Sequence, residues 1–239
     1  MPDGSKPGLQ VSDDPFQQLS NVLLGELSLD EVLNLVVDLA EGTLDVADAA
    51  SVSVKDHGKR VTPASSEKIA TDLDQVQYDH DEGPCIDAMN TGQEIASFPL
   101  DEERWKRFAP VALASGVKGM FSLPLRTERE TIGALNLYSR NEEGPGESER
   151  ELGRMFARQA AVVVANSLAF ADSRKLSEQL QEALQSREVI GQAKGILMLR
   201  EGYGPDEAFD ALRKMSQDSN VKLREVAQRL VDSVRKTTT

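Results

Sequence analysis

The feature that most constrains the fold is a long segment, residues 151–190, that lacks helix breakers apart from Gly153 near its start. A stripe of mostly apolar residues, with Gln159 and Asn166 as polar members, follows it at spacings of three and four, as helix packing requires. They are Leu152, Phe156, Gln159, Val163, Asn166, Leu176, Leu180, Ala183 and Ile190. A helix of about 40 residues is about 60 Å long, too long for one small domain to cover. We therefore expect a helix that links two domains.

A helix of this length usually pairs with a copy of itself. The apolar stripe is interrupted by Ser173 and Arg187, so its heptad pattern is imperfect. We expect a short coiled coil over residues 172–186 and a homodimer formed through the long helix.

Charge is distributed unevenly along the 239 residues. The formal net charge of −13 argues against nucleic-acid binding by the whole surface. Residues 1–186 carry a net charge of −15, whereas residues 187–239 carry 10 basic and 8 acidic residues, a net charge of +2. A charge of +2 is ordinary by itself, but the asymmetry indicates two parts with different partners.

Other features of the sequence bear on its location. Its longest apolar run, residues 160–165, is far shorter than the about 20 residues of a membrane span. The start, Met1-Pro2-Asp3-Gly4, lacks the basic and apolar parts of a signal peptide. Cys85 is the single cysteine, so an internal disulfide is impossible. We expect a cytoplasmic protein without membrane contact.

Helix signals surround strand signals between residues 14 and 171. Asp14-Pro15 and the capping-box pair Ser28 and Glu31 mark two helix starts. Further helices are expected at 67–78, 85–90 and 101–115. Strands are expected at 49–54, 60–64, 94–97, 119–125 and 131–138, with a turn at His57-Gly58 and a hairpin across 126–130. This order predicts an α+β domain with a mainly antiparallel sheet, preceded by a mobile, disordered terminus at residues 1–13.

Residues 187–236 divide into three amphipathic helical pieces. The first ends at Gly202-Tyr203-Gly204, and the second begins at Pro205 and ends near Ser219. The third is expected to be capped by Asn220. Its apolar stripe fits the helical period without a fault: Leu223, Val226, Ala227, Leu230, Val231 and Val234. We expect a compact three-helix bundle.

The C-terminal bundle resembles the ANTAR family of RNA-binding antitermination modules over residues 187–236. The residues that carry the likeness are Arg187, Ile190, Ala193-Lys194-Gly195-Ile196-Leu197-Met198, Ala208-Phe209, Leu212-Arg213, Ser216, Asn220, Lys222-Leu223, Val226-Ala227 and Val231. The resemblance implies binding to paired RNA stem-loops, which prevents a terminator from forming.

Residues 20–170 resemble a GAF sensor domain, a PAS-like α/β fold, and the domain is expected to span residues 14–171. The residues concerned are Asp81-Glu82-Gly83-Pro84-Cys85, Ala88, Gly92 and the hairpin segments Phe121-Ser122-Leu123-Pro124-Leu125 and Ile132-Gly133-Ala134-Leu135-Asn136-Leu137-Tyr138. The order of the two domains is similar to that of actinobacterial GAF–ANTAR regulators. The GAF fold is versatile, so the resemblance leaves the sensed ligand or partner open.

Five residues of the C-terminal module are candidates for RNA contact: Lys194, Arg213, Ser216, Asn220 and Lys222. Lys194 and Arg213 each follow a core residue, which places them at the edge of the buried stripe. An arginine can bind phosphate bidentately or stack on a base, and a lysine acts as a point charge. The alternatives are a solvated face for the basic residues and helix capping for Ser216 and Asn220.

Gly195 lies in the middle of a predicted helix, where glycine costs about 1 kcal/mol relative to alanine. Close approach of another helix or of RNA would explain it.

Five residues of the sensor domain are candidates for a ligand pocket: Cys85, Met89, Trp105, Phe108 and Met120. Core packing explains these residues equally well. A thiol at a helix start could have a lowered pKa and react, but a small buried apolar residue is the commoner role of a lone cysteine.

No metal site is expected. His57 and His80 are the only histidines, and neither has the ligand spacing of such a site. The cofactor stays unidentified, with a small-molecule ligand of the GAF domain as the expectation.

These observations predict a signal-responsive antitermination regulator, not an enzyme. Two other classes stay open. The C-terminal helices could bind DNA or protein. The sensor domain could be a redox enzyme, since some GAF-fold proteins reduce methionine sulfoxide, although that chemistry needs more than the one cysteine found here.

Overall fold

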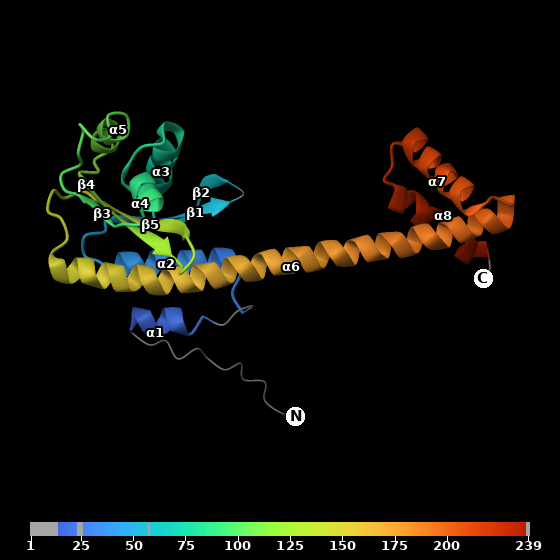
Figure 1. The fold of residues 1–239 in the computed structure, drawn as a ribbon, viewed down its shortest axis with the longest axis horizontal. Helices are drawn as coiled ribbons and strands as arrows, with labels where there is room; N and C mark the ends of the chain where they lie inside the picture. The colour runs from blue at the N-terminus through green and yellow to red at the C-terminus, as the bar shows by residue number, and fades with distance from the viewer. Residues whose placement is uncertain (1–13, 23–25, 57, 238–239) are drawn as a thin grey trace, which may run out of the picture. The chain divides into compact units, whose positions relative to one another are not determined.

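The computed structural model describes residues 14–22, 26–56 and 58–237. The expected mobile terminus at residues 1–13 and His57 of the expected turn lie outside the described residues. The chain forms two compact units, one ending at Ala171 and one beginning at Asp172 (Figure 1). No helix among the described residues is long and apolar enough to cross a membrane.

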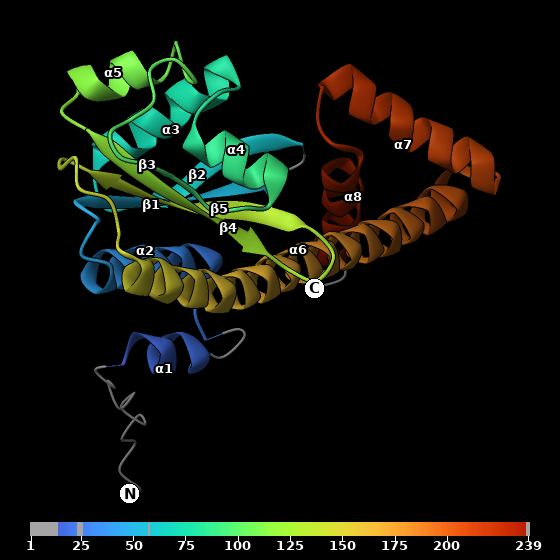
Figure 2. The ribbon, with the colours of Figure 1, turned by 60° about the vertical axis from the view of Figure 1, so that its left-hand side comes forward.

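The first unit contains a five-stranded antiparallel sheet in the order β2-β1-β5-β4-β3. Its strands are β1 (Ala49–Asp56), β2 (Lys59–Ser65), β3 (Ile95–Ser97), β4 (Gly119–Arg126) and β5 (Thr131–Ser139). Helices α1 (Pro15–Ser20), α2 (Leu29–Thr43) and the first part of α6 (Glu147–Glu201) cover one face. Helices α3 (Lys68–His80), α4 (Pro84–Thr91) and α5 (Ala109–Ala114) cover the other (Figure 2). The expected α+β architecture is therefore confirmed.

Local sequence signals set the starts of the first two helices. The Asp14 carboxylate accepts a hydrogen bond from the amide of Phe16 at 2.9 Å. Ser28 and Glu31 form the expected capping box, in which each side chain accepts from the other residue's amide. Both caps satisfy amides that have no partner inside their helix.

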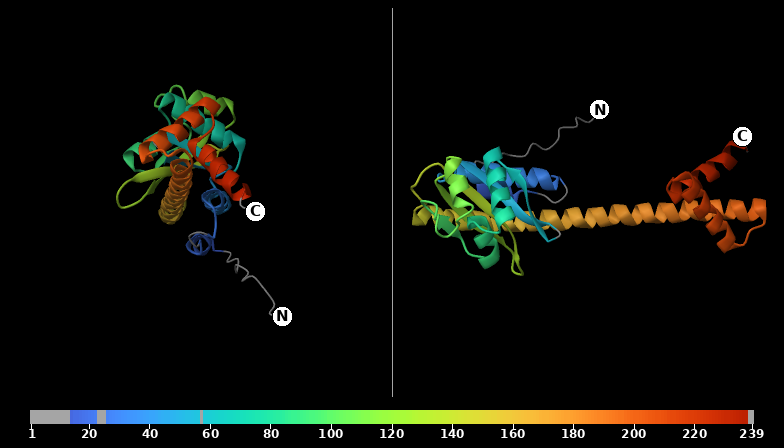
Figure 3. Two further views of the ribbon diagram at one scale, coloured as in Figure 1. Left: turned by 90° about the vertical axis from the view of Figure 1, so that its right-hand side faces the viewer. Right: turned by 90° about the horizontal axis from the view of Figure 1, so that it is seen from above.

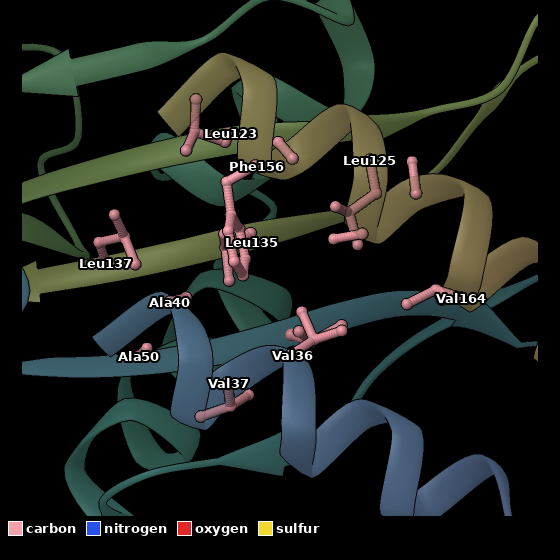
Figure 4. Close-up of a cluster of buried hydrophobic side chains, with 14 of the residues drawn as sticks. Val36, Val37, Ala40, Ala50, Leu123, Leu125, Leu135, Leu137, Phe156 and Val164 are labelled. Carbon is pink, nitrogen blue, oxygen red and sulfur yellow. The ribbon is translucent and has the colours of Figure 1, made fainter. Parts of the chain in front are cut away.

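The first face of the sheet carries the larger apolar core. Phe156 of α6 points towards Leu135 of β5 (Figure 4), and Val36 and Val37 of α2 belong to the same core. The Phe156 ring also meets Phe16 of α1 edge-on, with 6.2 Å between the ring centroids. This core fixes the first part of α6 on the sheet.

The second face carries a smaller core in which polar groups are mixed with apolar ones. Two glycines permit its tight packing. Gly83 has φ +132°, and a Cβ atom on it would lie 2.2 Å from Oε1 of Gln77. A Cβ atom on Gly133 would lie 2.1 Å from the carbonyl oxygen of Ser53 on the neighbouring strand. These contacts explain two glycines of the GAF-like segments.

The helix expected at 101–115 was too long, because only Ala109–Ala114 is helical. The Glu82 carboxylate accepts hydrogen bonds from the amides of Arg107 and Phe108. In a helix these two amides would bond to carbonyls four residues earlier. The contact with Glu82 therefore holds residues 101–108 as a succession of turns.

The second unit packs the last part of α6 against α7 (Pro205–Ser219) and α8 (Leu223–Thr237). Helix α6 is uninterrupted from Glu147 to Glu201 (Figure 3), so the first helix of the expected bundle is its C-terminal end. The core consists of Ala193, Leu197, Ala208, Leu212, Val226, Ala227 and Val231. These are positions on the predicted apolar stripes, so the three-helix bundle is confirmed.

Two details of the second unit differ from expectation. Asn220 ends α7 in the left-handed conformation, with φ 52°, instead of beginning α8. The carbonyl of Lys222 accepts from the amide of Val226 at the start of α8, as an N-cap carbonyl does. Outside its own turn of helix, no atom of the described residues lies within 4 Å of where a Cβ on Gly195 would be, so close approach of another described helix does not explain that glycine.

Candidate functional site

Lys194 and Arg213 lie on one edge of the C-terminal bundle. The Lys194 ammonium is 5.8 Å from the centroid of the Phe209 ring, a cation–π contact between α6 and α7. Phe209 and Arg213 are four residues apart in α7, so their side chains are neighbours on the same face. We call the surface of Lys194, Phe209 and Arg213 the α7 edge. Arg213 is exposed there and has no ion pair among the described residues.

Ser216 and Asn220 have structural roles in the connection between α7 and α8. The Ser216 hydroxyl donates to the carbonyl of Val221 at 2.6 Å, and the amide of Val221 donates to the carbonyl of Ser216 at 3.1 Å. Asn220 provides the left-handed turn between them. Asn220 therefore caps α7 and Ser216 shapes the connection. Contact of either residue with RNA stays a prediction.

Lys222 lies at the other end of this connection, beside α6. Its exposed side chain lines a shallow groove with Gln179, Glu182, Ala183, Ser186 and Arg224. We call this the α6–α8 groove. Arg224 forms an ion pair with Glu182 across it. Arg224 was not predicted as a contact residue from the sequence, because a basic residue in an amphipathic helix is usually solvated.

In the first unit, the five candidate pocket residues do come together. Cys85, Met89, Trp105, Phe108 and Met120 all belong to the core on the second face of the sheet, and all are buried. Burial raises the pKa of the Cys85 thiol to about 12. A reactive thiolate is therefore the wrong interpretation, and the buried apolar role fits.

A polar network crosses this core and was not foreseen from the sequence. Asp74 of α3 is fully buried, and its carboxylate accepts hydrogen bonds at 2.6 to 2.9 Å. The donors are the hydroxyls of Ser51, Thr62 and Tyr138 and the amide group of Asn136. Burial raises the pKa of Asp74 to about 6 because these neutral donors only partly replace water. No local sequence pattern predicts this network, because the partners of Asp74 come from three different strands.

Two side-chain atoms next to this network have no hydrogen-bond partner among the described residues: Oγ of Ser122 and Oδ1 of Asn136. Ser122 of β4 and Asn136 of β5 are directly paired in register, and both are fully buried. Buried polar atoms without partners are uncommon in folded proteins. Their position makes this face of the sheet the best candidate for a sensor site.

The turns at residues 101–108 cover the same core and are held by α4 and the residues before it. Asp87 of α4 accepts from the indole nitrogen of Trp105 at 3.1 Å and forms an ion pair with Arg104 at 2.6 Å. Glu82 accepts from the amides of Arg107 and Phe108. These contacts hold the turns next to Trp105 and Phe108, which are both buried.

No group of three or more His, Cys, Asp or Glu side chains suited to a metal ion occurs among the described residues. His57 lies outside the described residues.

Comparison with known families matches this division of the molecule. Residues 26–165 match the GAF domain family and residues 178–231 match the ANTAR domain family. The chain therefore belongs to the GAF domain family and carries a C-terminal ANTAR domain. This domain content points to a signal-sensing regulator rather than an enzyme.

One relative is similar to the C-terminal module. The nitrate regulatory protein of Klebsiella oxytoca is 40% identical over 52 residues. The match covers 22% of this chain and 13% of that protein, so the chain spans only a small part of its relative.

Solved structures resemble the first unit. A domain assigned to a two-component sensor histidine kinase of Sinorhizobium meliloti has 20% identity and a TM-score of 0.51, with 62% of this chain and 98% of that chain covered. The GAF domain of an Acinetobacter phosphoenolpyruvate-protein phosphotransferase has 14% identity and a TM-score of 0.49, with 65% and 90% covered. The first likeness shows that a solved structure shares the fold of the first unit.

Proposed function

We propose that this chain is a transcription antitermination regulator. Its GAF domain senses a ligand or a partner and controls the binding of its ANTAR domain to RNA stem-loops. The α7 edge carries the proposal, because it presents Lys194 and Arg213 beside an aromatic ring within the ANTAR domain. Cations suit the RNA backbone, and an arginine or an aromatic face suits an unstacked loop base. Lys222 would add a third cation at the far end of the connection.

The proposed dimer uses the exposed apolar side chains of α6. Leu176, Leu180 and Leu184 follow at intervals of four residues, and each is more than half exposed. A second copy of the same helix would cover them in a short coiled coil. Two linked ANTAR domains would bind two stem-loops with a gain from effective concentration.

The proposed sensor site is the second face of the GAF sheet, whose core contains Cys85, Met89 and Met120 and which also carries the unpartnered atoms of Ser122 and Asn136. A small molecule with a hydrogen-bond donor would satisfy Oδ1 of Asn136 while covering apolar neighbours. The turns at residues 101–108 would have to open for entry.

A charge-matched pair of variants tests RNA binding by the α7 edge. Arg213→Gln removes a cation from the edge, and Lys214→Gln removes one from the adjacent, exposed position of the same helix. The RNA is a pair of stem-loops selected by the full chain from a random pool. In filter binding we expect Arg213→Gln to weaken affinity about ten-fold, as loss of one charge-assisted contact does. Lys214→Gln should change it little.

Equal losses in the two variants would contradict a specific role for the α7 edge. Preference for duplex DNA over the selected RNA in a competition at fixed salt would instead favour a DNA-binding regulator.

A further inference from the structure

Arg224 holds a carboxylate at the start of α8. It is the second residue of that helix, and its guanidinium pairs with Glu182 of α6. Both side chains stay partly open to solvent, with exposed fractions of 41% and 59%. Two grooves meet at the pair: the α6–α8 groove, and a second one lined also by Gln185, Val189 and Gln228. The ion pair is therefore open to solvent and borders both grooves.

The surroundings of Arg224 suit a phosphate group. An arginine guanidinium binds carboxylate and phosphate through the same two-pronged geometry. The N-terminus of α8 adds the positive end of a helix dipole. Glu225 of the same turn lines the second groove, so the place for a phosphate is the α6–α8 groove. Lys222 lines the same groove and has no ion pair among the described residues. The Glu182 carboxylate thus occupies a place where a phosphate would also be stabilised.

We propose that Arg224 contacts the RNA backbone and that Glu182 competes with the RNA for it. This inference rests on the proposed RNA binding and adds to it one contact residue and one inhibitory contact. An exposed ion pair contributes little stability, so a phosphate in the groove can replace the carboxylate. Glu182 belongs to the helix that leads from the GAF domain, so a change in α6 at this point would alter the availability of Arg224.

Removing the competing carboxylate tests the proposal against a matched control. Glu182→Gln releases Arg224. Glu178→Gln removes the same charge one turn earlier, where Glu178 pairs with Arg174 at 3.1 Å. Affinity of the full chain for the selected stem-loop RNA is measured by filter binding at one salt concentration. Glu182→Gln should bind about two- to five-fold more tightly than Glu178→Gln, the effect of releasing one exposed ion pair.

A second pair of variants shows whether the gain depends on Arg224. Arg224→Gln should weaken RNA binding, and adding Glu182→Gln to it should give no gain beyond that of Glu178→Gln. Circular dichroism melting of each variant verifies the fold. Equal affinities for Glu182→Gln and Glu178→Gln, or unchanged affinity for Arg224→Gln, would overturn the inference while leaving the proposed function intact. Failure of the unaltered chain to bind any RNA would contradict both.

Discussion

At the scale of single residues, Asp74 combines complete burial with an all-neutral set of hydrogen-bond donors. Ser51, Thr62, Asn136 and Tyr138 surround its two oxygens. The other titratable groups facing this network are Tyr78 and Cys85, and burial raises the pKa of each. Arg60, a cation that acts electrostatically on Cys85, pairs with Asp81 outside the network. The ionised form of Asp74 is therefore poorly compensated.

This arrangement predicts that the GAF domain is more stable in mild acid. The folded pKa of Asp74, about 6, exceeds its ordinary value of 3.8, so the folded protein takes up the proton first as pH falls. Its contribution to the free energy of unfolding should rise by about 1 kcal/mol between pH 7.5 and pH 5. The single tryptophan, Trp105, is buried in this unit, so its fluorescence follows unfolding in urea.

The control for this prediction is Asp74→Asn, which keeps the size of the side chain and removes its titration. The free energy of unfolding is measured against pH for the variant and for the unaltered chain. Subtracting the first curve from the second gives the contribution of Asp74. If this difference in the free energy of unfolding stays constant or falls towards pH 5, ionisation of Asp74 does not destabilise the folded domain and the prediction is wrong.

At the scale of elements, α6 is divided between a buried start and an exposed continuation. Phe156, Ala160 and Val164 are buried in the GAF core, whereas Leu176, Leu180 and Leu184 are exposed. Exposed leucines at regular intervals are typical of a surface that another element covers. The second copy proposed above would be that element.

We predict that Leu180→Asn shifts the chain from dimer to monomer, because it places an amide in the apolar row. Leu199→Asn is the control, since Leu199 is 88% exposed but lies beyond this row. Sedimentation equilibrium distinguishes the 26.1 kDa monomer from a dimer. A monomeric unaltered chain, or a dimer that survives Leu180→Asn, would refute pairing through α6.

The starts and the types of the helices could be predicted where they depend on residues close together in the sequence. The Ser28–Glu31 capping box, Pro205 and the stripe of α8 are all visible in the sequence. The prediction of a helix over 101–115 was wrong in its extent, because the carboxylate of Glu82, distant in sequence, accepts hydrogen bonds from two of the backbone amides in this segment. The Asp74 network could not be predicted for the same reason, because its members come together only when the strands and helices pack. The RNA-contact and ligand-contact residues stay predictions.

At the scale of the whole molecule, the chain joins a GAF domain to an ANTAR domain through one helix. In the proposed mechanism, a signal in the GAF domain changes how α6 pairs or how Glu182 engages Arg224. Either change would alter RNA affinity without altering the α7 edge itself. Linkage of this kind requires that the signal favour one state of α6 over the other.

Binding of one and of two stem-loops by the same protein tests this account most directly. The unaltered full chain should bind RNA with two selected stem-loops at least ten-fold more tightly than RNA with one, because a dimer engages both. Leu180→Asn should remove that difference and leave binding of the single stem-loop unchanged. Equal affinity of the unaltered chain for both RNAs, or no binding to either, would contradict the account.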